Sequence, residues 1–369
     1  MKTDANVIPI CNFIKNMIMS VTGIQAFVKL GIKIQEALNR EAAQYDGLTK
    51  QQINLLLQVK KSGIENGWFT KEMVESAFYG IAEMLNENEL KQWLETYLKS
   101  IDFDRKPKEV GIIMAGNIPA VGFHDFLCVL LSGNTAVIKT SSDDALLIPS
   151  ISDLLISIDS SFSERINFIK APRSKYDAVI ATGSNNSARY FEQYFGKYPN
   201  IIRKSRTSVA ILTGEETEKE IEGLAKDLFT YYGLGCRNVS KLLVTESFDV
   251  QRLIDGLIKY SSFLKNNVKY QNNIDYNKSI YIINKIPFLD GGSFLFKEDQ
   301  SLHSPISVTF YEKFNSLEDI DSYIERNKDE IQCVVSSQIS RGVSFGAAQH
   351  PKVWDYADKV DTMKFLLEL

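Results

Sequence analysis

From Val110 onward the chain alternates short apolar runs with segments that read as helices of about ten residues. The runs "VGIIMAG", "TAVIKT", "YDAVIAT" and "SVAILTG" have the length and composition of buried strands. Helical segments such as "FHDFLCVLLSGN" and "NNSARYFEQYFGK" lie between them. This alternation predicts βαβ units and a parallel, doubly wound α/β sheet. Ligands of such sheets bind at the carboxyl ends of the strands.

Helices are predicted for the first hundred or so residues, where apolar side chains recur at helical intervals. A second α/β unit begins near residue 233 with the strand "SKLLVTE" and the helix "DVQRLIDGLIKY". It continues through "SIYIIN", "SPISVTFYE", the helix "SLEDIDSYIER" and the strand "QCVVSS". The chain is therefore expected to form an N-terminal helical region and two α/β parts.

Composition narrows the class of protein. With 44% hydrophobic and 24% charged residues, the chain has the make-up of a globular protein. A net charge of -4 disfavours a nucleic-acid partner. Four scattered cysteines without a C-x-x-C pair favour a reducing, cytoplasmic location, and together with three scattered histidines they predict no bound metal. The apolar N-terminus is interrupted by Pro9, Asn12 and Lys15, so we expect neither a signal peptide nor a membrane span.

Cys236 occupies the joint between a helix and a strand in "GLGCRNVSKLLV". Gly233 and Gly235 allow backbone angles that other residues rarely adopt, so a tight turn is predicted there. The cysteine could be a small apolar filler. Alternatively it could be a thiolate that meets a ligand, with Arg237 as a candidate for the positive charge that lowers its pKa.

Asn117 follows the first strand in "MAGNIPAVGFHDFL". It could be a loop asparagine tolerated in an unusual conformation. It could also be an amide that stabilises a developing oxyanion together with the backbone N–H of Cys236. His124, which opens the next helix, is interpreted as a helix-start residue rather than a catalyst.

Two other strand ends carry polar residues. Lys139, Thr140 and Ser141 follow the second strand and suit a phosphate or a ribose, or form an ordinary surface. Gly183 and Ser184 lie between a strand and a helix, where backbone N–H groups could meet a pyrophosphate. The usual G-x-G-x-x-G fingerprint is absent.

In this order, these stretches resemble the aldehyde dehydrogenase superfamily and, more closely, its acyl-CoA reductase branch of the LuxC type, which makes fatty aldehyde for bacterial luminescence. "GNIPAVGFHDFLCVLLSGNTAVIKTSS", "ATGSNNSARYF", "GLGCRNVSKLLV" and "QHPKVWDYADKVDTMKFL" carry the resemblance. It implies a Cys236 nucleophile, an Asn117 oxyanion donor and NADPH as cofactor. It also implies that Lys139, Thr140 and Ser141 contact the adenosine ribose or its 2′-phosphate, and that Gly183 and Ser184 belong to the cofactor-binding turn.

The resemblance has two departures. Where hydrolytic relatives carry a general-base glutamate, this chain has "IIRKSRTS", with Arg203 near the matching position. The loss of a water-activating base favours exchange with a thiol over acid formation. The glutamate that holds the nicotinamide ribose also has no match in "SLHSPISV", where Ser301 or His303 could substitute.

The resemblance divides the chain into four parts. Residues 1–105 form a helical region packed on the cofactor domain, 106–232 a Rossmann-like NADP-binding domain, and 233–340 the catalytic domain. Residues 341–369 return to the first lobe or make a subunit contact. The implied reaction is reduction of a long-chain acyl thioester, from acyl-CoA or an acyl-protein, to an aldehyde. An acyl-protein synthetase partner and a homo-oligomer are expected. A glutamyl-phosphate-type reductase and a non-catalytic acyl-binding homologue remain as alternatives.

Overall fold

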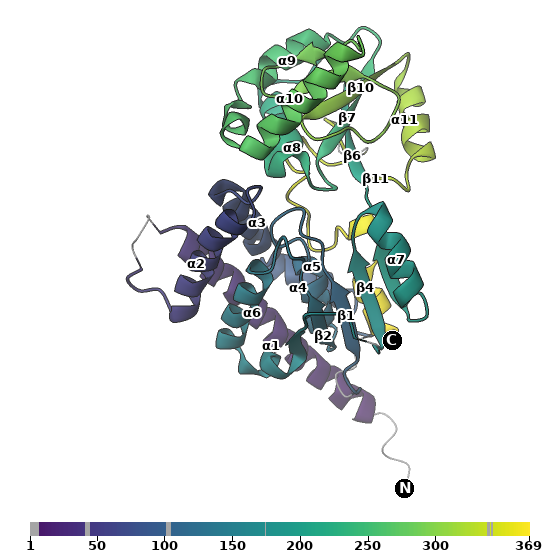
Figure 1. Ribbon diagram of the computed structural model, residues 1–369. Coiled ribbons are helices and arrows are strands. Elements are labelled where there is room, and N and C mark those ends of the chain that lie inside the picture. The colour runs from purple at the N-terminus through teal and green to yellow at the C-terminus, as the bar shows by residue number, and fades with distance from the viewer. Residues whose placement is uncertain (1–6, 41–44, 101–104, 174, 338–339, 341) are drawn as a thin grey trace. The chain divides into compact units, whose positions relative to one another are not determined.

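The computed structural model describes residues 7–40, 45–100, 105–173, 175–337, 340 and 342–369, and for residues 7–22 it describes the backbone alone. Within it the chain forms two compact units, one made of 1–204 and 352–369 and the other of 205–351 (Figure 1). The side chain of Cys11 lies outside the described part of the chain. The predicted domain boundaries near residues 105 and 341 adjoin or include residues that are also outside it.

The first unit is built on a five-stranded sheet whose strands are all parallel, in the order β3-β2-β1-β4-β5. Its strands are β1 (Glu109–Ile113), β2 (Thr135–Lys139), β3 (Ile166–Phe168), β4 (Ala178–Thr182) and β5 (Asn200–Arg203). The order in which strands are added reverses at β1: the chain places β2 and β3 on one side of β1, and then β4 and β5 on the other. A switch point of this kind places the loops after β1 and β4 side by side.

Alternate residues of each strand face opposite sides of this sheet and meet different helices. Ile112 and Ile180 belong to a large core shared with helices on one side, whereas Ile113 and Val179 belong to a smaller cluster with Phe195 of α7. Figure 1 shows α6 and α7 on opposite sides of the sheet. The helices of the unit are α1 (Val7–Leu38), α2 (Lys50–Glu65), α3 (Lys71–Met84), α4 (Glu87–Glu95), α5 (Phe123–Leu131), α6 (Leu147–Ile158), α7 (Asn185–Phe195) and α12 (Thr362–Leu367).

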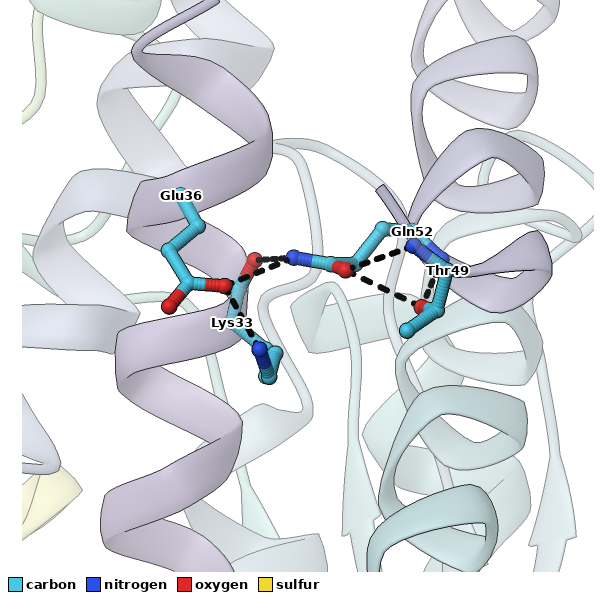
Figure 2. A network of polar contacts seen from close by, with 4 residues as sticks. All are labelled: Lys33, Glu36, Thr49 and Gln52. Atoms are coloured by element: carbon cyan, nitrogen blue, oxygen red, sulfur yellow. Dashed lines mark hydrogen bonds and ion pairs between the residues drawn. The ribbon is translucent and has the colours of Figure 1, made fainter. Parts of the chain in front are cut away.

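The N-terminal helices are joined by a polar network at the start of α2. Thr49 and Gln52 form a reciprocal capping box, which satisfies backbone N–H groups that a helix start leaves unpaired. The buried Gln52 amide also donates to the Lys33 carbonyl at 2.9 Å and to the Glu36 carboxylate at 3.2 Å, and thereby ties α2 to α1 (Figure 2).

The second unit contains a six-stranded sheet in the order β11-β6-β7-β10-β9-β8. All neighbouring pairs are parallel except β8 with β9. Its strands are β6 (Thr207–Leu212), β7 (Val239–Thr245), β8 (Leu289–Asp290), β9 (Leu295–Glu298), β10 (Val308–Phe314) and β11 (Ile331–Val335). Its helices are α8 (Glu218–Phe229), α9 (Val250–Ile258), α10 (Val268–Ile283) and α11 (Leu317–Arg326).

The predicted α/β fold with a Rossmann-like first sheet and an N-terminal helical region is confirmed. The structure assigns one stretch that the sequence analysis left without an element, and it places one strand differently. The stretch "SIYIIN" forms the end of α10 and the turn after it. Strand β6, which the sequence analysis placed with the first part, pairs with β7 and β11 and belongs to the second sheet. Which function each part carries stays a prediction.

Candidate active site

Cys236 lies in the turn between a 3-10 segment (η2, Thr230–Gly233) and β7, with its side chain partly exposed. Three consecutive residues before this turn have positive φ: Tyr231 at 53°, Tyr232 at 57° and Gly233 at 76°. Left-handed backbone is costly for a tyrosine and persists only where packing holds it. Both tyrosines are buried, and the Tyr232 ring packs on Tyr270 at a centroid distance of 5.7 Å. The packing of these buried tyrosines therefore holds the turn that carries Cys236.

Asn238 fixes the residues just before the cysteine. Its side-chain oxygen accepts from the Gly235 N–H at 2.8 Å, and its own N–H donates to the Gly235 carbonyl at 3.0 Å. In a trans peptide the C=O and the following N–H point in opposite directions. Because the Gly235 carbonyl points to Asn238, the N–H of Cys236 points away from it.

Arg237, the predicted source of positive charge near the thiol, is held by the segment that follows β11. Its Nε donates to the Ala348 carbonyl. Asp227 lies in the same region and accepts from the N–H groups of Gly346 at 2.6 Å and Ala348 at 3.0 Å. Burial raises the pKa of Asp227 to about 6. These contacts anchor the segment after β11 to the turn of Cys236.

Asn117 lies in the loop that follows β1, with its side chain exposed. The loop is shaped by Ala120, whose φ is 52° and whose N–H donates to the buried Asp144 carboxylate at 2.7 Å. A Cβ on Gly116 would come within 2.6 Å of the Ser141 hydroxyl, so only glycine allows the Asn117 loop to approach the segment after β2 this closely. The structure thus brings the loops of Asn117 and Ser141 together.

The other predicted cofactor residues lie at the same edge of the sheet. Lys139 ends β2 opposite Ile113 of β1, and its ammonium donates to the Thr140 carbonyl at 2.7 Å. Ser184 caps α7 by accepting from the Ser187 N–H at 3.2 Å. A Cβ on Gly183 would meet Ser187 at 2.8 Å, so the glycine lets the strand and helix close up tightly. The carboxyl ends of β2, β1 and β4 therefore present these polar groups together, whereas Cys236 belongs to the second unit.

His124 and Arg203 are both engaged in structural contacts. The His124 Nε2 donates to the Val353 carbonyl at 2.8 Å, and burial lowers its pKa, so the ring is held neutral. Arg203 is buried in an ion pair with Asp125 of α5 and also donates to the Thr362 hydroxyl at 2.9 Å. Both residues thereby hold the C-terminal segment 352–369 against the first unit.

The residues considered for the nicotinamide ribose lie after β9 in the second unit. His303 is exposed and approaches the Glu330 carboxylate at 3.3 Å. The N–H of Ser301 donates to Asp299 at 2.8 Å. Neither contact indicates a ribose ligand.

Sequence reasoning overlooked two buried polar residues that shape the candidate site. Asp144 holds the Asn117 loop, and Asn238 holds the Cys236 turn. Each had a signal in the sequence. Asp144 is an acid just before a helix, the usual place for a side chain that accepts backbone N–H groups. Asn238 is an asparagine three residues after a glycine in a predicted turn.

Cofactor and metal groups can be assessed from the same residues. Across the described ranges, no three His, Cys, Asp or Glu side chains gather in a way that could hold a metal ion. At the edge formed by β2, β1 and β4, a dinucleotide could bind the backbone N–H groups at the start of α7, which packs closely on β4 because Ser187 and Phe191 fill the space that a Cβ on Gly183 would need. Among the helices that the structure describes, none is long and apolar enough to cross a bilayer.

Comparison with known families gives a specific match. A family model described as "Acyl-CoA reductase (LuxC)" matches residues 68–273. The long-chain acyl-protein thioester reductase 2 of Photobacterium leiognathi is 25% identical over 225 residues, which cover 54% of this chain and 46% of that protein. The long-chain acyl-protein thioester reductase of Aliivibrio fischeri is 25% identical over 198 residues, covering 47% and 40%. The matches thus span less than half the length of these relatives.

Solved structures show the same fold. The succinate-bound aldehyde dehydrogenase 21 of Physcomitrella patens aligns with a TM-score of 0.59 at 12% identity, covering 94% of this chain and 87% of that one. Lactaldehyde dehydrogenase of Escherichia coli aligns with a TM-score of 0.58 at 12% identity, covering 86% and 74%. At this identity the likeness defines the architecture and leaves the chemistry to the residues of the site.

Proposed function

Because the chain belongs to the acyl-CoA reductase (LuxC) family, we propose that it reduces an acyl thioester to an aldehyde through an acyl group carried on Cys236. The observation that carries this proposal is the turn of Cys236. It presents a partly exposed thiol from a firmly held backbone, inside the range matched by the family model. By contrast, Cys128 is buried, and burial raises the pKa of its thiol well above the usual range. Of these two cysteines, the partly exposed Cys236 is therefore the better candidate for a nucleophile.

In the proposed mechanism the Cys236 thiolate attacks the thioester carbonyl, and the former thiol leaves as the acyl-enzyme forms. The amide of Asn117 and the N–H of Cys236 stabilise the oxyanion of the tetrahedral intermediate. The hydride that reduces the acyl group would come from NADPH bound at the carboxyl edge of the first sheet. Cys236 then departs from the reduced carbon as a thiolate, and the aldehyde is released. A general-base carboxylate is not required, because no water attacks the acyl-enzyme.

Cofactor binding is assigned to the carboxyl edge of the first sheet. Lys139, Thr140 and Ser141 would contact the adenosine ribose or its 2′-phosphate, and a lysine there favours NADP over NAD. The backbone of Gly183 and Ser184 at the start of α7 would receive the pyrophosphate. The close packing of Gly116 on Ser141 supports this assignment, because it joins the Asn117 loop to the ribose-binding segment.

The acyl donor is proposed from the relatives, whose names specify long-chain acyl-protein thioesters. We propose a long-chain acyl group delivered by CoA or by a protein thiol, with an acyl-protein synthetase as the supplier. A homo-oligomer is proposed from the family resemblance, and a cytoplasmic location from the four scattered cysteines.

The covalent step is tested by incubating the protein with long-chain acyl-CoA alone and mapping its peptides by mass spectrometry. We expect one acyl adduct, on the peptide that contains Cys236. The Cys236→Ala variant should lose the adduct and all NADPH oxidation, whereas Cys128→Ala should keep both. An adduct on another residue, or NADPH oxidation by Cys236→Ala, would refute the proposal. Comparison with an acyl phosphate separates this activity from that of a glutamyl-phosphate-type reductase.

A further inference from the structure

The peptide that follows Cys236 is held by a buried serine of the neighbouring strand. Ser208 of β6 is fully buried, and its hydroxyl donates to the Cys236 carbonyl at 3.0 Å. A carbonyl oxygen can only accept, so the single hydroxyl proton of Ser208 is committed to this bond. The plane of the peptide between Cys236 and Arg237 is thereby fixed.

A second cysteine completes this support. The Cys333 N–H donates to the Ser208 hydroxyl oxygen at 3.2 Å, and the Cys333 Sγ lies 3.1 Å from the same oxygen. Because the Ser208 proton points to Cys236, the Cys333 thiol must be the donor in the sulfur contact. A chain of hydrogen bonds therefore runs from the Cys333 thiol through Ser208 to the carbonyl of Cys236.

A β-bulge places Cys333 in this position. The pairing of β11 with β6 shifts register between Ile331 and Val334, and both of these residues pack into the same cluster against α11. Gln332 and Cys333 together lie opposite the single residue Ser208, so β11 has one extra residue here, and Cys333 faces the side of the sheet on which Ser208 lies. Bulges commonly re-aim a side chain in this way and are frequent beside active sites.

On the other side of the cysteine, Asn238 fixes the preceding peptide. It bonds both polar groups of Gly235, as described above. Its Nδ2 donates to the carbonyls of Asp227 at 3.0 Å and Thr230 at 2.8 Å, at the end of α8. Since a residue has only two soft backbone dihedrals, fixing the peptides before and after Cys236 fixes the direction of its Cβ.

We propose that Ser208 and Asn238 are positioning residues that aim the thiol and the N–H of Cys236, and that the Cys333 thiol keeps the Ser208 hydroxyl directed at the Cys236 carbonyl. The consequence for acyl transfer rests on the proposed function. The backbone restraint itself does not, because it follows from the hydrogen bonds alone.

The test compares Ser208→Ala with Ser240→Ala. Ser240 of β7 is the control, because its half-buried hydroxyl donates to the backbone carbonyl of Leu302 at the same 3.0 Å and accepts from the Thr207 hydroxyl at 2.6 Å, whereas Ser208 bonds the Cys236 carbonyl. Three quantities are measured for each variant: acyl transfer from acyl-CoA to the Cys236 peptide, alkylation of that peptide by iodoacetamide, and amide hydrogen exchange in 234–238.

For Ser208→Ala we expect acyl transfer to fall about 10- to 100-fold, because the reacting groups lose their alignment. Alkylation needs only an accessible thiolate, so it should change far less. Amide exchange in 234–238 should accelerate. Ser240→Ala should leave acyl transfer and this exchange as in the wild type. Cys333→Ala should show a smaller loss than Ser208→Ala, and Cys333→Ser, which retains a donor, should restore the rate.

Unchanged exchange in Ser208→Ala would overturn the proposal, as would equal loss of acyl transfer in the Ser240→Ala control. Parallel changes of acyl transfer and alkylation would assign Ser208 a purely structural role and also overturn it. If the wild type accepts no acyl group, the proposed reductase function fails. The exchange comparison then decides the positioning role by itself.

Discussion

The buried ion pair between Arg203 and Asp125 gives a sharp prediction about stability. Their side chains are 5% and 8% exposed, so both charges have left water. Arg203 also donates to the Thr362 hydroxyl, while its Nε and the Asp125 Oδ1 have no hydrogen-bond partner. Removing only the arginine leaves a buried carboxylate with no counter-charge. Breaking a buried pair in this way typically costs about 3–5 kcal/mol.

We therefore expect Arg203→Met to lower the free energy of unfolding of the first unit by about 3–5 kcal/mol. For a unit of this size, each kcal/mol lowers the melting temperature by about 2–4 °C. Calorimetry should show a fall of roughly 6–20 °C in the transition of this unit. The double variant Arg203→Met with Asp125→Leu should recover most of the loss, because replacing both charges with apolar groups is often neutral.

The matched control is Lys204→Met, which breaks the adjacent ion pair with Glu192. That pair is 58% and 51% exposed, so its loss should cost about 0–1 kcal/mol. The reasoning is refuted if Arg203→Met loses no more than Lys204→Met, or if the double variant is as unstable as Arg203→Met alone.

Three further predictions concern the site and its supports. Asn117→Ala should reduce turnover about a hundredfold or more at an unchanged melting temperature, because one oxyanion donor is lost; normal turnover would exclude this role. Burial raises the pKa of Asp144 from 3.8 to about 6. Between these two pH values the Asp144 carboxyl is therefore protonated in the native state and ionised in the unfolded state. Its contribution to the free energy of unfolding should therefore fall by about 3 kcal/mol as the pH rises through this window. Urea titrations should show this fall in the wild type and a smaller one in Asp144→Asn; equal slopes would contradict it. Gly223→Ala should destabilise the second unit by about 1–3 kcal/mol, since its Cβ would lie 2.6 Å from the Phe345 backbone. Gly256→Ala, whose Cβ would meet only methyl carbons of the Ile221 side chain, at 3.3 and 3.6 Å, should stay within about 1 kcal/mol of the wild type in the same assay.

Local patterns in the sequence were sufficient to predict the strands, helices and loops that carry the candidate residues. The strand "TAVIKT" and the capped start of α7 at Ser184 follow from apolar runs and helix-start residues, which depend on near neighbours only. The same holds for the turn at Gly233, because its positive φ reflects a local need for glycine. The order of these motifs also indicated the family.

Only the tertiary structure decided how distant residues pair. In the structure β6 belongs to the second sheet, residues 352–369 belong to the first unit, and Arg203 forms an ion pair with Asp125. Cys333 also faces Ser208 because of a bulge in β11 that no local sequence pattern predicts. Such contacts join residues far apart in the chain. Which residues meet depends on how whole helices and strands pack and on the need to hydrogen-bond each buried polar group. A local sequence pattern contains neither kind of information.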